Sequence, residues 1–240
     1  MKKFLLLTVM IALFAIIGQV KAQDPCDITG TNCDYWHTGG NTTYNDPNFP
    51  GCDIEIEWDY MVCDGITYFS LSTISFFWTP ECEAVYYFLV PFGNYADGRN
   101  LAIMWRSAFE QISRDYFTAY HFQHPNDYIC PNTYTCKTIT PGGCNSWRWA
   151  MKLPGPGEQY SWIHLKYTPC EENGCCVTEA IWCWNRNTNS PELIGKPTTQ
   201  YVTEGDCRNK SPLYNPFEGY GPEWLIGPPS PCGFSCYIDN

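Results

Sequence analysis

The chain has 240 residues and carries 25 acidic against 14 basic side chains, which gives a formal net charge of −11 at pH 7. Nucleic acids and anionic membrane surfaces are bound through basic patches, so this charge argues against both as partners. Aromatic residues make up 17% of the chain, a fraction high enough to predict that some of them lie at an interface.

The first 22 residues have the three-part layout of a secretory signal peptide. A basic start, Met1-Lys2-Lys3, precedes an apolar run over residues 5–17 and a small-residue exit at Ala22. The run is shorter than the roughly 20 apolar residues that a membrane-spanning helix needs. We therefore expect cleavage after Ala22 and a secreted, extracellular mature chain that does not insert into a membrane.

All fifteen cysteines follow this segment, and fifteen is an odd number. An oxidising compartment favours pairing into disulfide bonds, so one cysteine must stay unpaired or join another molecule. We expect this cysteine in an irregular segment that a neighbouring molecule could reach, while the pairing itself does not follow from sequence. The fifteen are Cys26, Cys33, Cys52, Cys63, Cys82, Cys130, Cys136, Cys144, Cys170, Cys175, Cys176, Cys183, Cys207, Cys232 and Cys236.

The N-terminal half predicts an irregular arm followed by a hairpin. Residues 23–52 are rich in Gly, Asn, Thr and Pro and predict an arm tied down by disulfide bonds. Residues 54–62 alternate between apolar and acidic side chains, which indicates an amphipathic strand. Asp64-Gly65 predicts a tight turn, and residues 66–78 are β-branched and aromatic and predict the returning strand. We expect a short helix over residues 81–90.

The strongest helical pattern covers residues 100–120, where apolar side chains recur at three- and four-residue spacings. The wide apolar stripe predicts that this helix lies flat on a sheet. Residues 121–145 are expected to form a loop. Alternation over residues 147–153, 160–168 and 175–185 then predicts three strands in an antiparallel meander.

Residues 186–240 are rich in proline and glycine and predict a C-terminal arm, tied back through Cys207, Cys232 and Cys236. The expected fold class is α+β. It comprises a core over residues 53–185, with a mostly antiparallel sheet of about five strands, one long helix packed on one face, and two irregular, disulfide-tied arms.

The first predicted strand presents four carboxylates, Asp53, Glu55, Glu57 and Asp59, on one face. Alternate side chains on a strand lie about 6.6–6.8 Å apart. We favour a solvated face whose charge discourages edge pairing. Two functional alternatives stay open, a glycosidase pair at Glu55 and Glu57 and a calcium site formed by all four carboxylates.

Residues 53–57, Asp-Ile-Glu-Ile-Glu, resemble the alternating acid motif of laminarinase-like jelly-roll glycosidases. The acids of that motif follow the order Glu, Asp, Glu, whereas this run begins with Asp53. The resemblance covers these five residues alone and implies a hydrolase that uses carboxylates of this strand.

Four aromatic residues define a second candidate site. If Thr168 pairs with Cys176 in a hairpin, the side chains of Tyr160, Trp162, Trp182 and Trp184 share one face of it. An exposed face of this kind would be a stacking platform for sugars or a subunit interface, whereas a covered one would be a second core layer under the C-terminal arm.

The leading hypothesis is a secreted, disulfide-stabilised, non-enzymatic structural or adhesive protein that self-associates into a surface layer or filament. The first alternative is a carbohydrate-binding module that uses the four aromatic residues. The second is a secreted glycoside hydrolase that uses Glu55 and Glu57. The expected partners are a second copy of the chain or a cell-surface glycan. No cofactor is expected, because nucleophile, phosphate-loop and dinucleotide motifs are lacking in the sequence.

Overall fold

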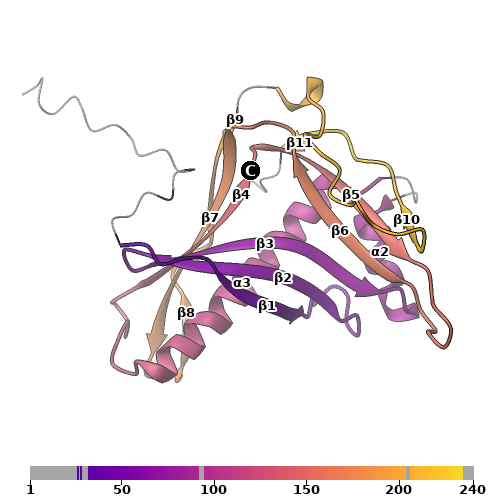
Figure 1. The fold of residues 1–240 in the computed structure, drawn as a ribbon. Coiled ribbons are helices and arrows are strands. Elements are labelled where there is room, and N and C mark those ends of the chain that lie inside the picture. The colour runs from indigo at the N-terminus through magenta and orange to yellow at the C-terminus, as the bar shows by residue number, and fades with distance from the viewer. Residues whose placement is uncertain (1–25, 27, 29–31, 92–94, 204–205, 235–240) are drawn as a thin grey trace, which may run out of the picture.

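The computed structural model describes residues 26, 28, 32–91, 95–203 and 206–234. The expected signal peptide over residues 1–22 lies outside these ranges, as does Cys236. The chain is mixed α+β, with one large sheet and a long helix beneath it (Figure 1).

Eleven strands of the described chain join in one sheet. The strands are β1 (His37–Tyr44), β2 (Ile54–Cys63), β3 (Ile66–Phe77), β4 (Tyr134–Pro141), β5 (Cys144–Lys152), β6 (Trp162–Pro169), β7 (Gly174–Asn185), β8 (Ser190–Leu193), β9 (Thr198–Thr203), β10 (Trp224–Ile226) and β11 (Gly233–Phe234). The helices are α2 (Glu83–Leu89) and α3 (Gly98–Gln123).

The sheet branches at β3. Strand β2 pairs antiparallel with β3 along one edge. On the other edge β3 pairs first with the parallel strand β4 and then with the antiparallel strand β6. One wing continues from β4 to β7, β8 and β9, and the other from β6 to β5, β10 and β11. In Figure 1 the two wings rise from β3 and approach each other near β9 and β11.

Helix α3 covers the inner face of this branched sheet. Its N-terminus is capped by Asp97, whose carboxylate accepts hydrogen bonds from the main-chain N–H groups of Arg99 and Asn100. The helix ends at Gln123, shortly before Pro125, which cannot continue it. Its apolar stripe packs against buried residues of both wings. The helix expected over residues 100–120 is therefore confirmed, with extensions at both ends, and so is the short helix that precedes it.

Strand number and pairing differ from the sequence prediction. The sheet has many more strands than the expected five, because the arms over residues 23–52 and 186–240 supply β1, β8, β9, β10 and β11. The expected loop over residues 121–145 contains β4, whose buried Thr138 and Thr140 alternate with more exposed neighbours. Buried threonines and short edge strands do not produce an apolar period, so the pattern missed both.

The expected hairpin between residues 160–168 and 175–185 was also wrong. Strand β6 lies between β3 and β5, and β7 pairs with β4, β8 and β9 instead. Adjacency along the chain suggested the hairpin, but the turn between β6 and β7 crosses from one wing of the sheet to the other.

Disulfide bonds tie the arms and the loop before β4 to the sheet. Cys176 is disulfide-bonded as well, and Cys136 is the free cysteine of the described chain. The six pairs whose two members are both described are Cys26–Cys175, Cys33–Cys63, Cys52–Cys82, Cys130–Cys183, Cys144–Cys207 and Cys170–Cys232. A disulfide-rich chain of this kind is consistent with a secreted protein.

The sequence predicted the free thiol in an accessible irregular segment, and this prediction is wrong. Cys136 is on β4 and is fully buried in the core beneath α3. Burial raises the pKa of its thiol above the ordinary range. A buried, protonated thiol is a poor nucleophile and a poor partner for another molecule.

We predict that Cys136 reacts with iodoacetamide only after the protein is unfolded. Native, unreduced protein and protein unfolded in guanidinium are treated in parallel, and the peptide that contains Cys136 is followed by mass spectrometry. Alkylation of this peptide in the native protein would contradict the burial of the thiol.

Candidate functional site

A cleft opens on the outer face of the sheet, opposite α3, beside the branch at β3. Its volume is about 330 Å³. The residues that line this outer cleft are Glu57, Ser72, Thr73, Pro141, Lys166, Tyr167, Pro169, Tyr214 and Pro216. They come from β2, β3, β6, the ends of both wings and the C-terminal arm, so the branch of the sheet creates the cleft.

The strand register explains which side chains meet there. Glu57 pairs with Thr73, Thr73 pairs with Lys166, and Lys166 pairs with Arg148. Paired residues on neighbouring strands lie side by side on the same face of a sheet. A row of polar and charged side chains therefore crosses the outer face from β2 to β5, and the cleft lies over its first three members.

A bulge in β3 brings a further hydroxyl to this row. The register between β2 and β3 shifts after Glu57, so that Thr73 and Leu71 have partners on β2 and Ser72 lies between them. The Ser72 hydroxyl donates to the Glu57 carboxylate and to the Glu57 main-chain oxygen, at 3.4 Å each. The neighbouring Thr73 Oγ1 is buried and has no hydrogen-bond partner among the described residues, which is a costly state for a hydroxyl group.

Part of the C-terminal arm forms the outer wall of the cleft. We call residues 208–231 the strap, because a disulfide bond lies at each end, Cys144–Cys207 and Cys170–Cys232. The strap passes over the outer side of β6 and then pairs with the edge of β5 as strand β10. Arg148 holds it by donating from Nε to the Gly227 oxygen and from Nη1 to Asn215 Oδ1, both at 2.7 Å.

Aromatic residues of the strap cover the row next to the cleft. The Lys166 ammonium lies 5.8 Å from the ring centre of Phe217 and 5.5 Å from that of Tyr220, which is the geometry of a cation–π contact. His164 lies two residues before Lys166, and its ring centre is 4.8 Å from that of Trp224. The strap thus holds Lys166 at the edge of the cleft.

His164 is the unusual titratable group of this region. Both of its ring nitrogens are buried and lack a hydrogen-bond partner among the described residues. Burial, together with the positive charge of Lys166, lowers the pKa of His164 to about 4, and the carboxylate of Glu57 opposes this shift. The imidazole is therefore neutral at pH 7.

The structure brings together some of the predicted site residues and separates others. Glu55, Glu57 and Trp162 share the outer face, where Trp162 pairs with Phe77 and contacts it at 4.2 Å between ring centres. Trp182 and Trp184 are buried on the inner face against α3. Tyr160 precedes β6 and has no place in the sheet. The predicted four-residue aromatic face is thus not formed, because its hairpin does not exist.

Three of the four carboxylates lie along β2, and Asp53 directly precedes this strand. Glu57 lines the outer cleft, whereas Glu55, Asp53 and Asp59 do not. Within the described residues no three His, Cys, Asp or Glu side chains gather as a metal site would require. Sequence reasoning missed Ser72, Thr73 and Tyr214, since only the strand register and the path of the strap bring them to Glu57.

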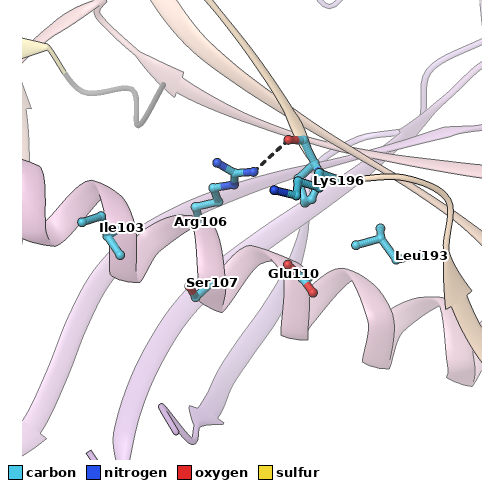
Figure 2. A pocket seen from close by; sticks show the side chains of 7 residues that line it. Ile103, Arg106, Ser107, Glu110, Leu193 and Lys196 are labelled. Carbon is cyan, nitrogen blue, oxygen red and sulfur yellow. Dashed lines mark hydrogen bonds between the residues drawn. The ribbon is translucent and has the colours of Figure 1, made fainter. Parts of the chain in front are cut away.

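A second hollow lies between α3 and the connection from β8 to β9, with a volume of about 390 Å³. Figure 2 shows the Arg106 side chain reaching across it, and Nη2 donates to the main-chain oxygen of Pro197 at 3.0 Å. Glu110 and Lys196 bring opposite charges to the same hollow. None of the residues predicted from sequence lies here, so the outer cleft is the stronger candidate.

Comparison with known proteins gives no match, whether to a family model, to a curated protein or to a solved structure. In the part of the chain that the structure describes, no helix combines the length and apolar character needed to cross a membrane. The chemistry of the outer cleft is therefore the ground on which a function can be assigned.

We predict that Trp182→Ala lowers the free energy of unfolding by about 3–5 kcal/mol, the usual cost of removing a buried tryptophan. Trp182 is 3% exposed, and its indole N–H donates to Ser113 Oγ at 3.1 Å. Trp36→Ala is the control, because Trp36 is 43% exposed and its loss should change stability by less than about 0.5 kcal/mol. Urea unfolding followed by circular dichroism measures both, and equal effects would place Trp182 outside the core.

Proposed function

We propose that this protein is a secreted, non-enzymatic glycan-binding protein whose ligand occupies the outer cleft. The observation that supports the proposal is the lining of the cleft, where a row of hydrogen-bonding groups meets exposed aromatic and proline surface. A sugar offers the complementary chemistry, with hydroxyl groups on its rim and C–H groups on its ring faces.

Each part of the cleft suits one part of a sugar. The Glu57 carboxylate accepts hydrogen bonds and the Lys166 ammonium donates them, while the Ser72 hydroxyl does both. Tyr214 is 55% exposed, so its ring can stack on a sugar face at little cost in ordering. A volume of about 330 Å³ lies at the lower end of the roughly 300–1,000 Å³ found for small-ligand sites, which fits a short saccharide unit.

The carboxylates favour binding over hydrolysis. Glycosidases of the common retaining and inverting types use two carboxyl groups that flank the scissile bond. Glu57 is the carboxylate that lines the outer cleft in the described chain, and Glu55 does not line it. A single carboxylate can hold a sugar hydroxyl, but it does not supply the acid and the nucleophile or base together.

Glu57→Gln and Tyr214→Ala should each weaken glycan binding. A hydrogen bond to a charged group contributes about 1.5–3 kcal/mol, so Glu57→Gln should cost roughly tenfold or more in affinity. A glycan array with neutral, acidic and amino sugars identifies the ligand, and calorimetry with that ligand gives the Kd of each variant.

The matched control is Tyr87→Ala, because Tyr87 is a tyrosine of similar exposure, 52%, on α2 and does not line the cleft. It should leave the Kd unchanged. The proposal fails if the wild-type protein retains no glycan, or if Tyr87→Ala weakens binding as much as the two cleft variants do.

Self-association is a second candidate, supported by the edge of the sheet. In the described chain β1 pairs with β2 alone, so its other edge is available for a strand from a second molecule. The adjoining Tyr35 is 75% exposed and Trp36 is 43% exposed. A structural or adhesive protein that polymerises through this edge would use both features.

We predict that exchanging both aromatic residues for lysine, Tyr35→Lys with Trp36→Lys, shifts any oligomer toward monomer, because like charges oppose pairing at the edge. Sedimentation velocity over a range of protein concentrations measures the distribution. A wild-type protein that stays monomeric throughout the range would remove self-association as a function.

A further inference from the structure

The strap is fixed at both ends to one corner of the sheet. One disulfide bond joins Cys207 to Cys144 and the other joins Cys232 to Cys170. Cys144 and Cys170 are neighbours on the sheet, since the Cys170 N–H donates to the Cys144 oxygen at 2.9 Å. The four sulfurs form a buried cluster of their own. The middle of the strap can therefore move away from the sheet while both ends stay bonded beside the outer cleft.

The middle of the strap is held less firmly than its ends. Near its start the Leu213 N–H donates to the Pro169 oxygen, and near its end the Leu153 N–H donates to the Glu223 oxygen. Between these anchors the described main-chain hydrogen bonds are local, such as Glu218 N–H to Asn215 oxygen at 3.2 Å. Side-chain contacts to Arg148, His164 and Lys166 attach this stretch to the sheet.

The stretch that lacks main-chain attachment also forms the cleft wall. Tyr214 and Pro216 line the outer cleft, and Tyr220 packs on His164 with its ring centre 6.4 Å away. Trp224, whose ring centre is 4.8 Å from that of His164, belongs to β10 and stays paired with β5. A change at His164 therefore acts on the same segment that closes the cleft.

The surroundings of His164 do not stabilise a protonated imidazole ring. Its partners on the neighbouring strands are Ser75 and Ala150, which carry no charge. Protonation would place a buried positive charge beside Lys166, with no hydrogen-bond acceptor on either ring nitrogen among the described residues. The charged and titratable groups around it on this face are Glu55 and Glu57 of β2, Arg148 and Lys152 of β5, Lys166 of β6, and Tyr220 of the strap.

We propose that the strap is an acid-released cover of the outer cleft, in which protonation of His164 lifts residues 214–222 and widens the cleft. The proposal rests on the proposed function for the nature of the ligand, but the movement itself requires no ligand.

The direction of the pH dependence follows from proton linkage. With the strap closed the pKa of His164 is about 4, whereas a solvated imidazole titrates near 6.5. The open form thus binds the proton more tightly, and acid favours it. The effect begins as the pH falls below 6.5, grows by up to about tenfold in the ratio of open to closed forms per pH unit, and is complete near pH 4.

Hydrogen exchange of the ligand-free, disulfide-intact protein tests the movement. Exchange is followed by mass spectrometry from about pH 7.5 to about pH 4 and corrected for the intrinsic pH dependence of amide exchange. We expect protection of the peptides that cover residues 214–222 to fall below pH 6.5, while peptides of β4, β7 and β10 keep theirs. His164→Phe, which keeps an aromatic ring and cannot be protonated, should abolish the fall, and His124→Phe, at an exposed histidine beyond α3, should not.

Substitutions at two neighbouring residues should shift the pH midpoint of the opening in opposite directions. Lys166→Met removes the positive charge that opposes protonation and should move the midpoint to higher pH. Glu57→Gln removes the negative charge that favours it and should move the midpoint to lower pH. These opposite shifts decide the matter even where His164→Phe does not fold.

Unchanged protection of the strap down to about pH 4 in the wild-type protein overturns the proposal, and so does an equal loss of protection in His164→Phe. Because the experiment contains no glycan, a negative glycan array would leave the movement standing. Conversely, a protein that binds glycan with a strap indifferent to pH would lose this inference alone.

Discussion

Strand β3 has two edges and three hydrogen-bonded partners, and the rest of the structure depends on how it shares them. β2 takes one edge, while β4 and β6 follow one another along the other. These two strands leave β3 near its middle, and their ends, Pro141 and Pro169, line the same cleft. Thr73 of β3 and Thr138 of β4 are buried with hydroxyl oxygens that lack partners in the described chain. Such groups are costly unless water or a ligand satisfies them.

A sheet that divides in this way must be held together where its wings end. Glu171 does this at the far end of β6, since its fully buried carboxylate accepts from the Cys144 N–H at 2.9 Å and pairs with the Lys210 ammonium. Removing one partner from a buried pair typically costs about 3–5 kcal/mol. The turn that follows needs Gly174, because a Cβ there would lie 2.7 Å from both Glu171 Oε1 and the Val202 oxygen. The corner that anchors the strap is thus rigid, and Lys210 at the start of the strap takes part in it.

The sequence predicted local structure well and long-range pairing poorly. The apolar stripe of α3 and the alternation in β2 are local patterns, and both elements formed as expected. The cleft depends on Glu57, Thr73 and Lys166, which are far apart in the chain and meet through two strand registers. No local pattern specifies those registers. The free cysteine shows the same limit, since Cys136 became buried through strand β4, whose buried threonines give no apolar signal.

Because a disulfide bond holds each end of the strap, the protonation of one side chain is sufficient to move it. A loop closed at both ends has already lost most of its conformational freedom, and the cost of closing it grows only slowly with its length. Lifting such a loop therefore gains little entropy, and its return does not require a search, because the effective concentration of the strap over β6 stays high. Under these conditions the contacts at Arg148, His164 and Lys166 set the balance between open and closed forms. A charge placed on His164 then acts directly on these contacts.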